Sequence, residues 1–133
     1  MSNSVELVED CLARLRQSPA FDIEMTLIEA DHGVVPLLMT AFDKELDPTI
    51  RTQLVYIIWQ HRLPGSAAFL GKAMGDPEPT VWKEALDGLV SLGSTEALRI
   101  LKDSWANPPA HQANSNVYRE WIAEAINQLH TKE

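Results

Sequence analysis

The chain has 133 residues, one cysteine and a formal net charge of −8 at neutral pH. This length suits one domain that buries a core without covalent cross-links, and a single cysteine excludes an intramolecular disulfide. The acidic balance argues against nucleic acid or an anionic membrane as a partner, since both attract basic surfaces.

The same features bear on where the protein works. We see no signal peptide, because no basic segment followed by an apolar one opens the sequence. The longest apolar run, residues 33–42, is too short to span a bilayer and contains Pro36. A single cysteine is also typical of a reducing compartment. We therefore expect a cytoplasmic protein.

Apolar residues recur at three- and four-residue spacing almost throughout, which predicts helices and no strands. Asp47 and Pro48 form a typical helix start, as N-cap and first helical residue. Ser66 and Ser94 are predicted as further N-caps, and Gly93 as a helix end. The eight predicted helices cover about residues 3–17, 22–30, 35–45, 48–62, 66–74, 80–92, 94–105 and 116–131.

Two stretches carry the same order of signals, "LDPTIRTQLVYIIWQHRLPGS" at 46–66 and "GDPEPTVWKEALDGLVSLGS" at 75–94. Each has Asp-Pro, a β-branched residue, a helical apolar pattern and Gly-Ser. The two Asp-Pro pairs are 29 residues apart, whereas Ile50 and Val81 are 31 apart, and Val117 follows 36 residues later. This spacing predicts helical hairpins of about 30 residues, with the extra residues in loops.

Superposing the second helix of each hairpin separates an apolar from a polar side. Trp59 and Trp121 fall on the apolar side and are predicted in the core, and Trp105 is expected to close its helix against the repeats. Trp82 and Tyr118 share one position, where packing between repeats is expected. The polar side holds Gln53, Tyr56, Ile57, Gln60, Lys83, Glu84, Asp87, Arg119, Glu120 and Glu124.

The segments "DPTIRTQLVYII" and "DPEPTVWKEALDGLVSLGSTEALRILKD" resemble the HEAT-repeat family, in particular the short bacterial HEAT-like repeats of phycobilin lyases. The two segments look like that family's pattern of Asp-Pro, Val-Arg, Ala and Leu-Gly, and the match is good over residues 33–105. Arg51 fits the family's arginine, whereas Trp82 and Tyr118 replace it later. The resemblance implies one all-α domain over residues 1–133: a short right-handed α-solenoid of about four antiparallel hairpins, with second helices on the concave side.

Residues that could carry chemistry are few. There is no P-loop and no dinucleotide glycine motif. No two of the four histidines lie at i, i+3 or i+4, so a helical metal pair is absent. Folding could bring His32 and His61 together with Asp31, but we expect ordinary surface histidines. Cys11 lies on an apolar helix face and is predicted to be buried, and Glu120 with Glu124 to be solvated. We predict no catalytic residue, no cofactor, no metal and no enzyme activity.

The leading functional hypothesis is a protein-binding module that uses the ten polar-side residues as a concave surface. Its acidity suits a partner with a basic surface, and we expect a monomer or weak dimer. Tyr56 and Ile57 are the expected anchors, unless the N-terminal hairpin covers them. Small acidic helical-repeat proteins resemble bacterial immunity proteins, which sequester toxins. Two alternatives are an accessory, lyase- or chaperone-like HEAT protein that handles a small ligand or chromophore, and a self-stacking scaffold.

Overall fold

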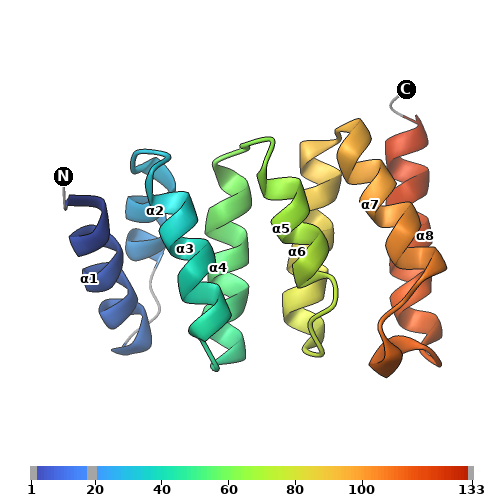
Figure 1. Ribbon diagram of the computed structural model, residues 1–133, viewed down its shortest axis with the longest axis horizontal. Helices are drawn as coiled ribbons and strands as arrows, with labels where there is room; N and C mark the ends of the chain where they lie inside the picture. Colours follow the sequence, from blue (N-terminus) through green and yellow to red (C-terminus); the bar gives the residue numbers. More distant parts are fainter. Residues whose placement is uncertain (1–2, 18–20, 132–133) are drawn as a thin grey trace. The chain divides into compact units, whose positions relative to one another are not determined.

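The computed structural model describes residues 3–17 and 21–131, and these residues form helices and no strand (Figure 1). The predicted helices are all present, with ends shifted by at most two residues, and a short 3-10 helix, η1, interrupts the predicted loop at 106–116. The helices are α1 (Asn3–Gln17), α2 (Phe21–Glu29), α3 (Val34–Lys44), α4 (Pro48–Gln60), α5 (Ser66–Ala73), α6 (Pro79–Leu92), α7 (Thr95–Ala106), η1 (Ala110–Gln112) and α8 (Asn116–Thr131).

The helices form two compact units, Met1–Arg62 and Leu63–Glu133. In the first, α1 packs against α2 and α3, while α4 packs against α2 and α3. In the second, α5 packs against α6 and α7, while α8 packs against α6 and α7. Each unit therefore holds two helical pairs that bury their apolar faces against each other. The single domain expected over residues 1–133 stays a prediction.

The repeated Asp-Pro signal forms the same local turn in both units. The Asp47 carboxylate accepts a hydrogen bond from the Thr49 N–H at 2.9 Å, and α4 begins at Pro48. The Asp76 carboxylate accepts one from the Glu78 N–H at 3.0 Å, but α6 begins only at Pro79. The additional turn residues thus precede the second helix. They explain why the Asp-Pro pairs and the helical positions have different spacings.

Two of the three other predicted helix signals are confirmed. Gly93 ends α6 with a φ of 59°, a left-handed conformation that suits glycine. Ser94 caps α7 by accepting a hydrogen bond from the Ala97 N–H at 3.0 Å. The predicted Ser66 cap is wrong, because Ser66 already lies inside the first turn. Its N–H donates to the Leu63 carbonyl at 3.0 Å, and its hydroxyl is buried without a hydrogen-bond partner.

The core predictions hold for three aromatic residues and fail at two positions of α8. Trp59, Trp82 and Tyr118 are buried as expected, with exposed fractions of 8%, 2% and 1%. Trp121, predicted in the core, is 42% exposed, and Val117 is 52% exposed. The physical reason is that α8 packs mainly against α6 and α7, so that part of its apolar side faces solvent. Further exposed apolar side chains are Trp105, at 45%, and Leu46, at 91%.

Arg51, which matches the family's arginine, joins the two helices of its pair. Its guanidinium Nη1 donates to the carbonyls of Phe42 at 3.0 Å and Glu45 at 2.7 Å, at the end of α3. The guanidinium also lies 4.0 Å from the centre of the Phe42 ring. The Phe42 carbonyl also accepts from the Glu45 N–H at 3.2 Å, so Arg51 adds a charged donor to the carbonyls at the end of α3. These contacts place a cation at the negative end of that helix.

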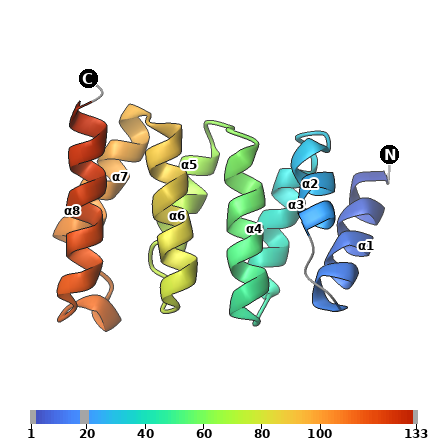
Figure 2. The same ribbon diagram turned by 180° about the vertical axis from the view of Figure 1, so that it is seen from behind.

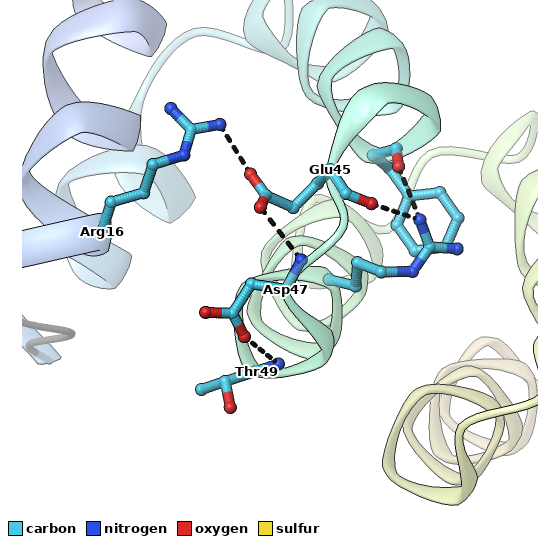
Figure 3. Close-up of polar contacts among 6 residues, drawn as sticks. Arg16, Glu45, Asp47 and Thr49 are labelled. Carbon is cyan, nitrogen blue, oxygen red and sulfur yellow. Dashed lines mark hydrogen bonds and ion pairs between the residues drawn. The ribbon is translucent and has the colours of Figure 1, made fainter.

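The buried Glu45 side chain continues this network toward α1 (Figure 3). Its Oε1 accepts from Arg16 Nη2 at 2.6 Å, and its Oε2 accepts from the Asp47 N–H at 3.2 Å. One carboxylate therefore connects α1, the end of α3 and the start of α4. Charge-assisted hydrogen bonds of this kind are stronger than neutral ones.

In the second unit an aromatic residue, like Arg51 in the first, donates a hydrogen bond to a carbonyl at the end of a helix. The Tyr118 hydroxyl of α8 donates to the carbonyl of Met74, the C-cap residue that follows α5, at 2.9 Å. The Tyr118 ring packs edge-to-face on Trp82, with ring centres 4.9 Å apart. Tyr118 replaces the family's arginine at this position, and it still satisfies a carbonyl at a helix end.

The burial of Tyr118 predicts a specific loss of stability at high pH. Burial raises the pKa of its phenol to about 12, and a hydrogen bond with Ser104 acts in the opposite direction. The pKa of a free tyrosine is about 10, so the folded protein holds this proton more tightly than the unfolded chain. The resulting stabilisation is complete below pH 10 and is lost as the pH rises from 10 to 12.

Urea unfolding of the wild type and of Tyr118→Phe, at about pH 9 and about pH 11, measures this difference. We expect the free energy of unfolding to fall further in the wild type than in the variant over this interval. Equal falls would contradict the assignment.

Candidate functional site

The ten residues predicted to form one concave row are divided between the two units. Four belong to α4 in the first unit, namely Gln53, Tyr56, Ile57 and Gln60. Six belong to α6 and α8 in the second unit, namely Lys83, Glu84, Asp87, Arg119, Glu120 and Glu124. The two groups differ in how much of them solvent can reach.

The α4 group is largely covered. Ile57 is fully buried, with an exposed fraction of 0%, so it is not a surface anchor, and the alternative that the N-terminal hairpin covers it is the correct one. The cause is α2, which packs against α4. Gln53, one turn before Ile57, hydrogen-bonds to Glu24 of α2, and His61, one turn after it, contacts the Leu27 carbonyl of α2. The face of α4 that the sequence predicted to be polar is therefore the face against which α2 packs.

The remaining α4 members are only partly accessible. Tyr56 is half-buried, and its ring packs edge-to-face on Trp59 with ring centres 5.8 Å apart. Gln60 is also half-buried. Both keep some contact with solvent, but neither stands out as an exposed anchor.

The second unit presents a more open surface on α6 and α8, which lie side by side in front of α5 and α7 (Figure 2). We call it the α6–α8 surface and define it by Lys83, Asp87, Glu120, Trp121 and Glu124. Asp87, Glu120, Trp121 and Glu124 are exposed, and Lys83 is half-buried. On α8, residues 120, 121 and 124 fall on one face because the helix turns about 100° per residue.

Aromatic contacts hold this surface in place. The Trp121 ring packs edge-to-face on the buried Trp82 ring, with centres 6.2 Å apart. The Lys83 ammonium lies 4.5 Å from the Trp121 ring centre and 5.7 Å from that of Trp82. A cation at these distances is attracted to the ring faces. Trp121 of α8 is therefore exposed, and its contacts with Trp82 and Lys83 hold it against α6.

The charge of the α6–α8 surface is acidic, with three carboxylates against one ammonium. Although Asp87 is exposed, neighbouring atoms remove part of the solvation of its carboxyl, and this partial desolvation raises the pKa of the group above its ordinary value. A carboxylate in this condition gains more from a nearby cation than a fully solvated one does. The surface thus favours positively charged groups.

Two other predicted members of the second unit, Arg119 and Glu84, are less accessible than the carboxylates of the α6–α8 surface. Arg119 Nε donates to the Trp105 carbonyl at 3.2 Å, and its guanidinium lies 5.4 Å from the Trp105 ring centre. Arg119 thus joins α8 to the end of α7. Glu84 is half-buried.

The structure tests the predictions for the cysteine and for a metal-binding cluster separately. Cys11 is buried as predicted, and its thiol pKa is raised by burial and by Asp10, against a smaller lowering effect of Arg14. A buried thiol with a raised pKa is a poor nucleophile. Within residues 3–17 and 21–131, no group of three or more His, Cys, Asp or Glu side chains could hold a metal ion.

The prediction that His32 and His61 are ordinary, separate surface histidines is wrong. His32 and His61, expected as ordinary surface residues, have their Nδ1 atoms 2.9 Å apart. Asp31 does not join them in such a group, and its carboxylate accepts a hydrogen bond from the Gly33 N–H at 2.8 Å. The sequence separates the two histidines by 29 residues, so no local pattern could pair them.

The first unit also has a groove of about 250 Å³ between α1 and α3. Its lining is mainly apolar and includes Val8, Leu12 and Leu37, together with the cationic Arg16 and Lys44. Pockets that bind drug-sized ligands usually span about 300–1,000 Å³. This groove therefore suits only a small molecule.

These successive helical pairs, with their repeated caps, define a helical-repeat protein. The family model for HEAT repeats matches residues 35–127, and the chain belongs to the HEAT-repeat family. HEAT repeats form α-solenoids, commonly mediate protein interactions and are generally non-enzymatic scaffolds. No curated protein and no solved structure matched the chain. In the part of the chain that the structure describes, no helix has the length and apolar character needed to cross a membrane.

Proposed function

We propose that this HEAT-repeat protein is a non-enzymatic binding module whose α6–α8 surface engages a protein partner with a basic surface. The observation that carries the proposal is Trp121, which is 42% exposed and held between Lys83 and Trp82. Exposed tryptophans are frequent hot spots in interfaces, and a rigid one loses little conformational entropy on binding.

The three carboxylates of the α6–α8 surface determine the kind of partner in this proposal. Long-range attraction between them and basic groups would raise the rate of encounter, and Trp121 would then supply apolar contact area. The finer form of the proposal is an immunity-type inhibitor that covers the active site of a basic toxin or another basic enzyme. It operates in the cytoplasm, as the single cysteine suggests.

The other predicted contacts keep a secondary place in this proposal. Tyr56, Gln60, Glu84 and Arg119 are half-buried and could add rim contacts, whereas Ile57 and Gln53 serve the packing of α2 on α4. Rim contacts contribute little affinity compared with a central aromatic anchor.

Affinity capture from host lysate at low and high salt, followed by mass spectrometry, identifies the partner. We expect one dominant basic protein that is retained less at high salt, because exposed charge pairs are screened. With the purified partner, Trp121→Ala should weaken binding by about 30-fold, the effect of a typical hot spot. Glu120→Lys with Glu124→Lys should mainly slow association.

The matched control is Glu9→Lys with Glu29→Lys, which makes the same change in net charge at exposed positions of α1 and α2. This control should bind nearly as the wild type does. A partner that tolerates the α8 variants, or that is equally sensitive to the control, would remove the α6–α8 surface from consideration.

A second candidate is an accessory protein that handles a small ligand, and the observation that favours it is the α1–α3 groove. Its volume of about 250 Å³ argues against a chromophore of drug size or larger. Ala41→Trp would fill the groove from α3. A ligand released by this change, with partner binding intact, would assign the groove a role of its own.

A further inference from the structure

The histidine pair of the first unit has an unusual arrangement of ring nitrogens. His61 follows α4 and is 7% exposed, and its Nε2 lies 2.9 Å from the Leu27 carbonyl of α2. A carbonyl oxygen only accepts hydrogen bonds, so Nε2 of His61 must carry the proton. In neutral His61 the Nδ1 atom therefore presents its lone pair.

His32 is the residue that faces this lone pair. It lies in the turn between α2 and α3, it is exposed, and its Nδ1 is 2.9 Å from Nδ1 of His61. The two rings meet edge-to-face, with centres 5.1 Å apart and planes at 71°. Without another ligand, His32 donates its Nδ1–H to His61. Because His32 is exposed, its proton can move to Nε2, where water accepts it.

We propose that His32 and His61 together form a binding site for a divalent transition-metal ion, with both Nδ1 atoms as ligands. When His32 carries its proton on Nε2, both Nδ1 atoms present lone pairs, and a rotation of the exposed His32 ring directs the two lone pairs at one ion. Histidines that bind metal usually donate their other N–H to a carbonyl or carboxylate, and the Leu27 carbonyl supplies this contact for His61. Water molecules would complete the coordination.

The separation of the nitrogens favours particular ions. Two nitrogens about 2.05 Å from one ion are about 2.9 Å apart at a 90° angle and about 3.4 Å apart at a tetrahedral angle. The observed 2.9 Å fits the 90° angle of tetragonal Ni²⁺ or Cu²⁺, whereas tetrahedral Zn²⁺ requires the rings to separate. We expect affinity in the order Cu²⁺ > Ni²⁺ > Zn²⁺, with Mg²⁺ not bound.

A bound ion would connect the α2–α3 turn to the end of α4. Because the unfolded chain separates the two histidines by 29 residues, the ion binds the folded state more tightly and stabilises it by mass action. This site lies in the first unit and is independent of the proposed partner-binding surface.

The test uses the full chain without an affinity tag, since a histidine tag would compete for the metal. Calorimetric titration with NiCl₂ should show one ion per chain, and the Tm should rise with Ni²⁺ and reach a plateau. His32→Gln changes an exposed side chain and leaves the His61–Leu27 contact in place. It should weaken Ni²⁺ binding at least tenfold and abolish the rise in Tm.

His111→Gln is the matched control, since His111 is an exposed histidine of the second unit. It should bind Ni²⁺ as the wild type does. The proposal is overturned if the wild type shows no saturable one-to-one binding, if His32→Gln binds as tightly as the wild type, or if His111→Gln loses as much affinity.

Discussion

Ile57→Ala is expected to lower the free energy of unfolding by about 3–4 kcal/mol, the largest effect among the substitutions considered for this protein. Ile57 is fully buried, and it lies between Gln53 and His61 on the face of α4 that carries α2. Truncation removes buried methyl and methylene groups and leaves a cavity, because the packed helices relax only in part. Urea unfolding followed by circular dichroism at 222 nm measures the loss.

Tyr56→Ala is the control for this prediction, since it changes the neighbouring side chain, which is only half-buried. We expect it to cost less than half as much. If Ile57→Ala left the stability near the wild-type value and abolished partner binding, Ile57 would be an exposed anchor and the packing of α2 on α4 would be contradicted. The experiment therefore separates a core role of this residue from a recognition role.

Arg51→Ala is expected to lower the free energy of unfolding by about 2–3 kcal/mol. The guanidinium donates to the carbonyls of Phe42 and Glu45 and packs over the Phe42 ring. Without it, helix-end carbonyls lose a charged donor, and the cation–π contact disappears. Thermal and urea unfolding of the purified variant measure the cost.

Two further variants interpret that result. Arg51→Lys keeps the charge but lacks the planar fork of donors, so it should recover only part of the stability. Arg14→Ala removes an exposed arginine that pairs with Asp10 on α1, and it should cost no more than about 1 kcal/mol. Equal effects of Arg51→Ala and Arg14→Ala would show that the α3 carbonyls do not depend on Arg51.

The candidate site was predictable in part. The 3.6-residue period was enough to place Asp87, Glu120 and Glu124 on exposed helix faces, because polar residues at this spacing avoid the core. The same period put Ile57 on the polar side and Trp121 on the apolar side, and both assignments were wrong. A period describes one helix, whereas exposure depends on how many helices pack around it.

The sequence by itself determined the helices, their ends and the repeat. These features depend on local interactions, such as the Asp47 and Ser94 caps and the left-handed Gly93, which act within a few residues of the chain. The HEAT-repeat resemblance rested on the same local signals and is confirmed by the family match over residues 35–127.

Only the tertiary structure decided which helix faces are covered and which distant side chains meet. The packing of α2 on α4 and the contact between His32 and His61 each join elements that are separate in the chain. The exposure of Trp121 likewise depends on which helices pack against α8. The energies of these contacts come from long-range packing and from hydrogen bonds between helices, to which hydrophobic spacing within one helix is insensitive. For this reason the binding surface and the histidine site could be proposed only after the helices were packed.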